Sequence, residues 1–272
     1  MNNILQEICI QLIKIINKDK HTEKRKGRPP KCSNKEYLDA IYYVLRTGIG
    51  WEYLKGFPVK GDAVRKKFKE WTCEGIFENA WTIAVKIYEK YKVNFEDTYI
   101  DASHIKNQLG TDFIGSNVYD RFRNGTKLTI IVDEIGVPIS IELGGSNIHD
   151  IKFVEKSLEN CVIDTDKIGY LVGDKGYISK ELSKKIADIY SIAIVTPRKK
   201  KKMQKGKIRG RKPKNHHKLK DRYIVEHSFS WMKCYSRLVR RKDKKGYMFK
   251  GFIYFGAADL TFNKITKYVL PN

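Results

Sequence analysis

Short apolar runs in the second half of the chain constrain its fold more than any other feature. They lie, in chain order, at residues 97–104, 127–133, 137–143, 168–174 and 191–197. Runs of this length, rich in β-branched residues and bounded by Gly, Pro or Asp, predict strands. Helical patterns at 150–161 and 179–189 separate the later runs. Three strands in series, followed by strand and helix in alternation, predict an α/β fold with a mixed sheet and helices on both faces.

Helices are predicted before the sheet. Ser33 with Glu36 three residues later is a helix-start signature, and Gly48 follows the last apolar position of that helix. Two more helices are predicted at 63–71 and 76–91. Short helices joined by glycine-containing turns are compatible with a helix-turn-helix DNA reader, and a generic helical bundle predicts the same pattern.

The strong positive charge limits the classes of partner. The chain has 54 Lys and Arg against 31 Asp and Glu, a net charge of +23. This excess indicates a polyanionic partner, with nucleic acid as the first candidate. The five cysteines form no Cys-x-x-Cys pair, which argues against a disulfide framework or a zinc site. No apolar run approaches the roughly 20 residues of a membrane span, so we expect a soluble, intracellular protein.

Basic side chains gather in a Gly-Pro-Pro linker, in the predicted helix 63–71 and in a loop at 198–220. The candidate DNA-binding residues are Arg25, Arg28, Arg65, Lys66, Lys67, Lys69, Lys199, Lys200, Lys201, Lys202, Arg209, Arg211 and Lys212. Linker cations of this kind enter narrow, AT-rich minor grooves. Loop cations contact phosphates without choosing a sequence. The alternative for each segment is a solvated linker, loop or helix face.

Residues 221–241 are predicted to form one amphipathic helix that carries a single carboxylate amid basic side chains. On a period of 3.6 residues, Arg222, Glu226 and Lys233 share one face. Apolar cover comes from Val225, Phe229, Met232 and Leu238. A carboxylate flanked by cations is compatible with a reactive centre. The alternative is a surface helix whose Arg–Glu pair contributes roughly 0.2–0.5 kcal/mol.

Two further acids extend this hypothesis, since Asp101 lies in the first predicted strand and Asp174 ends the fourth. Phosphodiester chemistry commonly uses two divalent ions held by shared carboxylates, which need rigid supports. If the two strands are neighbours and the helix of Glu226 packs across them, the three acids converge. Each strand acid also has a structural interpretation as a turn residue. Asp133 is interpreted as a hairpin-turn residue and Asp150 as a helix cap.

The motifs together resemble insertion-sequence transposases of the DDE class over about nine-tenths of the chain. The segments that carry the resemblance are GRPPK, VLRTGIGW, FKEW with EGIF, YIDASHIK, IIVDEIGVPISIEL with the later His-Asp pair, and VGDKGY. The helix of the third acid resembles the Y-R-E-K signature of this family. Arg222, Glu226 and Lys233 fit its spacing, and Leu219 stands in the tyrosine position. Only the basic loop precedes the third acid, as in the compact branch of the family.

The resemblance implies a domain organisation and a set of catalytic residues. Residues 1–92 would form a helix-turn-helix-like DNA-binding domain, and residues 93–272 an RNase H-like catalytic domain. Two Mg²⁺ ions, or Mn²⁺ in their place, would be bound by Asp101, Asp174 and Glu226. Arg222 and Lys233 would stabilise phosphate charge.

The reaction implied by the resemblance is cut-and-paste transposition. The enzyme would cleave the ends of a DNA element by metal-dependent hydrolysis and join the freed 3′-hydroxyl to target DNA, as a homodimer. In a bacterium it would work in the cytoplasm on the nucleoid, and elsewhere in a nucleus or viral factory. Two alternatives stay open: a catalytically silent DNA-binding protein derived from a transposase, which Leu219 favours, and an RNase H-like nuclease.

Overall fold

The structure is a computed structural model that describes residues 1–20, 31–92, 95–198 and 215–268. The chain folds into two compact units. The first, called the helical unit, consists of residues 1–91, 105–114 and 231–272. The second, called the sheet unit, consists of residues 92–104 and 115–230.

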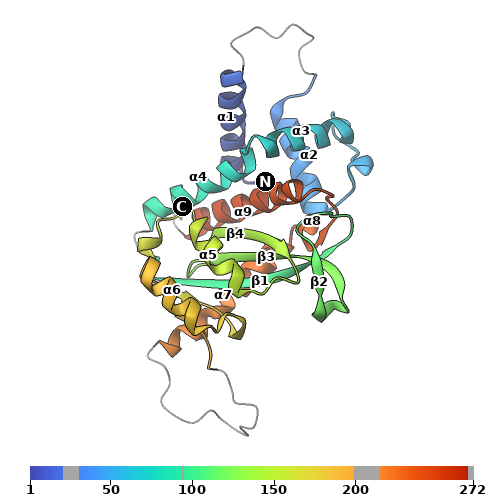
Figure 1. Ribbon diagram of the computed structural model, residues 1–272. Helices are drawn as coiled ribbons and strands as arrows, with labels where there is room; N and C mark the ends of the chain where they lie inside the picture. The colour runs from blue at the N-terminus through green and yellow to red at the C-terminus, as the bar shows by residue number, and fades with distance from the viewer. Residues whose placement is uncertain (21–30, 93–94, 199–214, 269–272) are drawn as a thin grey trace. The chain divides into compact units, whose positions relative to one another are not determined.

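Within the described residues, seven strands form one mixed sheet (Figure 1). They are β1 (Asp97–Asn107), β2 (Gly115–Asn117), β3 (Arg123–Val132), β4 (Pro138–Gly145), β5 (Tyr170–Val172), β6 (Ala193–Val195) and β7 (Arg240–Arg241). Strand β3 pairs with β1, β2 and β4, and on the other side of β1 follow β5 and then β6. The predicted α/β fold with a mixed sheet is confirmed.

The β3–β4 hairpin shows how local sequence sets this topology. Gly136 adopts a φ of 80° in the turn, a conformation that glycine tolerates without a steric penalty. The carboxylate of Asp133 accepts hydrogen bonds from the backbone N–H groups of Ile135 (3.2 Å) and Val137 (2.8 Å). The predicted hairpin-turn role of Asp133 is therefore confirmed. All eight residues of β4 are buried, so both faces of this strand are covered.

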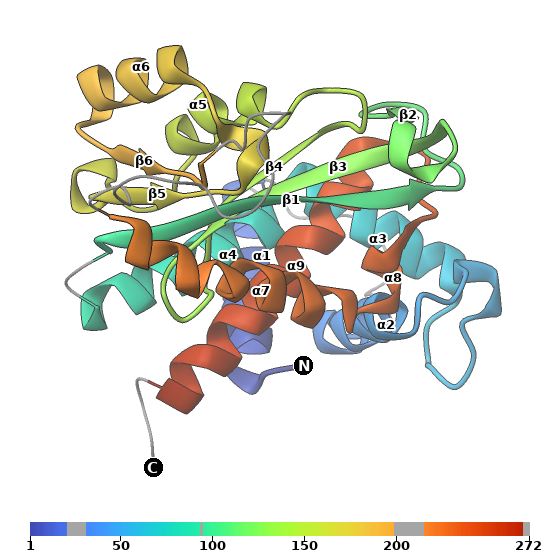
Figure 2. The same cartoon turned by 90° about the horizontal axis from the view of Figure 1, so that it is seen from below.

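Helices lie on both faces of the sheet (Figure 2). Helices α5 (Ile151–Glu159) and α6 (Lys180–Tyr190) lie on one face, and α7 (Tyr223–Lys233) lies on the other. Helix α6 starts where its sequence predicts, because the hydroxyl of Ser179 accepts a hydrogen bond from the Leu182 N–H (3.2 Å).

The single helix predicted for residues 221–241 is wrong. Helix α7 ends at Lys233, and a short helix α8 (Ser236–Val239) follows after the extended residue Tyr235. The hydroxyl of Tyr235 donates to the carboxylate of Asp259 (2.7 Å), and the ring is buried. A tertiary contact therefore overrides the helical period at this point.

The helical unit packs around the long helix α9 (Gly246–Tyr268). The other helices of the unit are α1 (Asn3–Lys20), α2 (Asn34–Thr47), α3 (Gly61–Cys73), α4 (Ile76–Tyr91) and α8, with a 3₁₀ turn at Trp51–Tyr53. The predicted limits of α2 are confirmed: Ser33 and Glu36 form a capping box, and Gly48 ends the helix at a φ of 66°. Helix α4 lies along α9 (Figure 1).

Aromatic rings fill the core of the helical unit. The ring of Phe252 on α9 stacks on that of Phe68 at 4.1 Å between centroids, and Phe255 contacts Phe77 at 4.8 Å. Asp259 is almost fully buried on the same helix, and accepts hydrogen bonds from the hydroxyls of two tyrosines and a backbone N–H. A buried carboxylate with three donors is satisfied without a cation.

The two compact units do not follow the division expected at residue 92. Residues 105–114 and 231–272 belong to the same unit as the N-terminal helices. The division into a DNA-binding and a catalytic domain concerns function, and it stays a prediction. No helix within the described ranges is long and apolar enough to span a membrane.

Candidate active site

Asp101 and Asp174 lie side by side because of the strand register. Strands β1 and β5 are parallel neighbours, and Tyr99 is the partner of Val172. Asp101 and Asp174 each follow these partners by two residues, so both lie at the same level and on the same face. The carboxylate of Asp101 accepts from the Ala102 N–H (2.8 Å) within β1, which continues through Asn107. The alternative that Asp101 is a turn residue is therefore wrong.

Asp174 ends β5 and begins a 3₁₀ turn. Its carboxylate accepts a hydrogen bond from the Gly176 N–H at 2.6 Å. The Asp-x-Gly turn predicted for this residue is confirmed, and it fixes the orientation of the carboxylate. A turn role and a site role are compatible, because a carboxylate has more acceptor positions than this one bond uses.

Two contacts position helix α7, which carries Glu226, within the sheet unit. The ammonium of Lys218, in the 3₁₀ turn before α7, donates to the carboxylate of Asp97 (2.5 Å) and lies 4.0 Å from the ring centroid of Tyr170. The hydroxyl of Ser228 on α7 donates to the carbonyl of Gly136 (2.9 Å). The residues between them, 219–227, are thereby positioned against β1, β5 and the β3–β4 turn.

Arg222 connects the strand acids to Glu226. Its guanidinium donates to Glu226 Oε1 (2.6 Å) and lies 3.6 Å from Asp101 Oδ2. The Glu226 side chain is 51% exposed, whereas that of Asp101 is 23% exposed. The structure therefore brings Asp101, Asp174, Glu226 and Arg222 together, and we call this group the acidic site.

The electrostatics of the acidic site are uneven. The pKa of Asp101 is raised to about 6, chiefly by burial and in addition by the nearby charges of Asp174 and Glu226. The Ala102 N–H and the Arg222 guanidinium act in the opposite direction, but they do not offset burial. One arginine thus leaves negative charge at the site incompletely compensated.

Asp150 is a neighbour of the acidic site that sequence reasoning assigned to another role. It occupies the N-cap position of α5, as predicted, but its side chain makes no capping hydrogen bond. The carboxylate instead accepts from the buried ammonium of Lys127 on β3 (2.5 Å). The carboxylates of Asp150 and Asp174 both lie beside Gly176. A β-carbon added to this glycine would be 3.0 Å from Asp150 Oδ2 and 2.8 Å from Asp174 Oδ1, so the two carboxylates are close to each other. No signal in the sequence identifies Lys127, because an isolated lysine in a strand predicts exposure.

Tyr177 is a second residue that sequence reasoning missed. Its hydroxyl is buried and has no hydrogen-bond partner among the described residues. Burial raises the pKa of Tyr177, and the charges of Asp150, Asp101 and Asp174 raise it further. A neutral hydroxyl donor therefore lies within electrostatic range of three carboxylates.

The remaining candidates are placed as follows. Lys233 is exposed at the end of α7, two helical turns after Glu226. Arg65, Lys66 and Lys69 are exposed on α3, whereas Lys67 is half-buried and bound to Glu70 at 2.9 Å. The other candidate DNA-binding residues lie outside the described residues: Arg25, Arg28, Lys199, Lys200, Lys201, Lys202, Arg209, Arg211 and Lys212.

The acidic site suits a divalent cation in its donor chemistry. Three carboxylates offer only hard oxygen ligands, which Mg²⁺ and Mn²⁺ prefer. Burial is the main cause of the raised pKa of Asp101, and the charges of Asp174 and Glu226, which a bound cation would neutralise, add to it. As the side chains stand, no group of three or more His, Cys, Asp or Glu in the described part of the chain could hold a metal ion. Arg222 takes the position of the compensating charge between Asp101 and Glu226.

Comparison with known families agrees with this geometry. Residues 96–247, which include every member of the acidic site, match the family described as the transposase DDE domain. Residues 11–81 match a family described as a transposase of the IS4/5 family. No curated protein matches the chain.

One solved structure with a TM-score of 0.50 shares the fold at low sequence identity. A piggyBac transposase synaptic complex with hairpin DNA matches with a TM-score of 0.50 and 11% identity, over 100% of this chain and 74% of that one. A Mos1 transposase paired-end complex with the left transposon end matches with a TM-score of 0.35 and 12% identity, over 95% and 85%. The fold of the sheet unit is RNase H-like. Because the DDE match covers more than half of its residues, the chain belongs to the insertion-sequence DDE transposases, which are divalent-metal-dependent enzymes of DNA cleavage and strand transfer.

Proposed function

We propose that this transposase binds the ends of a DNA insertion element, cleaves them and joins the freed 3′-hydroxyl to target DNA, by a cut-and-paste route. The observation that carries the proposal is the grouping of Asp174 and Glu226 near Asp101, with the Arg222 guanidinium between Asp101 and Glu226. The net charge of +23 supports DNA as the partner, because a strongly basic chain attracts the phosphate backbone. Three acids are nevertheless retained together in this chain.

We assign the metal-binding role to the three acids. Asp101, Asp174 and Glu226 would hold Mg²⁺, with Mn²⁺ as a substitute. When bound, such ions activate water and stabilise the leaving 3′ oxygen. The Gly176 N–H and the Ala102 N–H orient two of the carboxylates before any ligand arrives. Asp101 is ready to bind a cation above its pKa of about 6, because its proton has then left.

The cations of α7 and the turn before it would act on the DNA. Arg222 is bound to Glu226 and near Asp101, so its guanidinium is placed to contact a phosphate at the acidic site. Lys233 lies two helical turns further along and is exposed. Cations held on a helix stabilise charge that develops at phosphate in the transition state. Two element ends must be joined in one event, so we expect a homodimer on DNA.

One observation favours the alternative of a catalytically silent DNA-binding protein. Leu219 stands in the tyrosine position of the family signature, so one phosphate contact of that signature is lost. All three acids are present, however, and this argues for retained cleavage.

Glu226→Gln separates the two functions. The variant keeps the size of the side chain but loses a carboxylate, so we expect no cleavage of a plasmid that carries the element with its flanking DNA, in Mg²⁺ or Mn²⁺. Binding to the same DNA in a mobility-shift assay should persist. Glu181→Gln on the exposed start of α6 is the matched control and should cleave normally. Cleavage by Glu226→Gln would remove this residue from the site, and an inactive wild-type protein that still binds DNA would support the silent alternative.

A further inference from the structure

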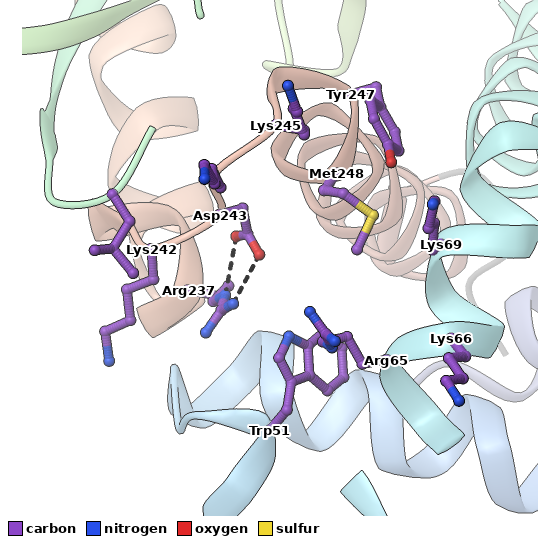
Figure 3. Close-up of a pocket in the computed structure, with 12 residues that line it drawn as sticks. Trp51, Arg65, Lys66, Lys69, Arg237, Lys242, Asp243, Lys245, Tyr247 and Met248 are labelled. Carbon is purple, nitrogen blue, oxygen red and sulfur yellow. Dashed lines mark hydrogen bonds and ion pairs between the residues drawn. The ribbon is translucent and has the colours of Figure 1, made fainter. Parts of the chain in front are cut away.

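A basic pocket of about 560 Å³ lies within the helical unit (Figure 3). Two segments far apart in the sequence form most of it: α3, and the segment from Lys242 into the start of α9. Its lining residues are Trp51, Arg65, Lys66, Lys69, Leu109, Arg237, Lys242, Asp243, Lys244, Lys245, Tyr247 and Met248. The pocket therefore combines lysines that sequence reasoning assigned to DNA with lysines that it assigned to no function.

The pocket has an unbalanced charge. Seven of its lining residues are Lys or Arg, and Asp243 is the only acid among the lining residues. The carboxylate of Asp243 is engaged by Arg237. The ammonium groups of Lys66, Lys69, Lys244 and Lys245 have no hydrogen-bond or ion-pair partner among the described residues. Four unpaired ammonium groups around one hollow repel one another, and an anion would relieve that repulsion.

Buried contacts fix the wall from which these lysines extend. Arg237 is 3% exposed and binds Asp243 through two hydrogen bonds, of 2.7 Å and 3.1 Å. It also donates to the carbonyl of Ile49 (3.2 Å), and the ammonium of Lys242 donates to that of Gly48 (2.6 Å). These bonds tie the segment before α9 to the turn after α2. Lys244 and Lys245 are thus held on an ordered backbone.

Trp51, one of the two aromatic residues that line the pocket, is not available to stack on a base. Trp51 is buried, and its ring stacks on Phe252 at 5.8 Å and contacts Phe68 at 5.7 Å. The guanidinium of Arg237 lies 5.7 Å from the centroid of the Trp51 ring. These neighbours occupy the ring, so it does not offer a free face for stacking. The other aromatic lining residue, Tyr247, is 38% exposed. The lysine ammonium groups outnumber this single ring, and they suit phosphate, which they bind as point charges.

We propose that this pocket binds consecutive backbone phosphates of a DNA strand through Lys66 and Lys69 on one side and Lys244 and Lys245 on the other. The inference rests on DNA as the proposed partner. It adds a site outside the acidic site, and it assigns a function to the segment that joins α8 to α9. Contacts of this kind position DNA without reading its sequence.

The salt dependence of DNA binding tests the pocket. Binding of the full chain to a fluorescent duplex is measured by anisotropy over a range of salt concentrations. Each lost phosphate contact reduces the slope of log K against log salt by about 0.9. We therefore expect the slope to fall by about 1–2 in Lys66→Ala/Lys69→Ala and again in Lys244→Ala/Lys245→Ala.

The matched control is Lys180→Ala/Lys184→Ala on the exposed side of α6, which removes the same formal charge. Substitution of the four pocket lysines by arginine should restore the wild-type slope of log K against log salt. An unchanged melting temperature shows that each variant is folded. Slopes in the pocket variants equal to that of the control would overturn the inference. An increase in the melting temperature with inorganic triphosphate, together with unchanged salt slopes for DNA binding in the pocket variants, would also overturn the inference. That result would favour a small phosphorylated ligand. Failure of the wild-type protein to bind DNA would instead contradict the proposed function.

Discussion

The acidic site and the basic pocket concentrate charge in different ways. In the acidic site, Asp174 and Glu226 lie near Asp101, one guanidinium contacts Asp101 and Glu226, and the pKa of Asp101 is raised to about 6, chiefly by burial. Four lysines of the basic pocket are exposed, and their shared charge is screened by water: Lys66, Lys69, Lys244 and Lys245. Interactions between charges grow stronger as water is excluded. Single substitutions should therefore have large effects in the acidic site, and small, additive effects in the pocket.

The largest expected effect is the loss of cleavage in Asp174→Asn. The amide oxygen can still accept from the Gly176 N–H, so the turn is kept while the charge is lost. Loss of one charged group at an active site lowers the rate by roughly 10²–10³-fold or more. Asp188→Asn on the exposed face of α6 is the control. Cleavage by Asp174→Asn within tenfold of the wild-type rate would place this acid outside the chemistry.

The second effect concerns the Arg237–Asp243 pair in the wall of the basic pocket. Asp243→Ala leaves the Arg237 guanidinium buried without its partner, which should lower the free energy of unfolding by about 3–5 kcal/mol. Urea denaturation measures the change. Arg237→Met/Asp243→Leu removes both charges and should recover most of the loss. A change below about 1 kcal/mol in Asp243→Ala would mean that the pair does not hold the pocket together.

The third effect is a dependence of stability on pH. The pKa of Asp101 is raised on folding, so the folded protein binds more protons than the unfolded chain between about pH 4 and pH 6. With metal removed by chelation, stability should therefore fall across this window as pH rises through the pKa of about 6, and the loss should be complete by roughly pH 7. Asp101→Asn has no charge to lose and should lack this component. Parallel pH profiles of the urea midpoint in the two proteins would contradict the raised pKa.

The smallest effect is on stability in Glu226→Gln. This carboxylate is half exposed, and its pair with Arg222 is a surface i,i+4 pair. Such pairs contribute about 0.3–0.5 kcal/mol, so the urea midpoint should barely move although cleavage is abolished. A loss of more than about 2 kcal/mol would show that Glu226 has a structural role.

Local sequence predicted the parts of the fold that depend on neighbouring residues. The capping box at Ser33, the stop at Gly48 and the hairpin turn at Asp133 follow from contacts within a few residues, and all three are confirmed. The break between α7 and α8 was not predictable in this way. It depends on the bond from Tyr235 to Asp259, which is 24 residues away.

The acidic site shows the same limit. Asp101 and Asp174 were identified because each belongs to a strand signal with a defined end. Asp150 was assigned to a helix start, and only the structure shows that its carboxylate turns to Lys127 and lies near Asp174. Contacts between side chains on different strands leave no periodic trace in the sequence. The pairing of Arg237 with Asp243 in the helical unit was invisible for a similar reason, since it depends on burial.

The central claim is that Asp101, Asp174 and Glu226 form one metal site. Crystals of the protein soaked in Mn²⁺ and measured by anomalous diffraction test it directly. The account predicts an anomalous peak with oxygens of Asp101 and Asp174 as ligands, Glu226 within reach, and Arg222 moved away from Asp101. A peak bound by Asp150 without Asp101, or no peak at Mn²⁺ concentrations that support cleavage, would contradict it.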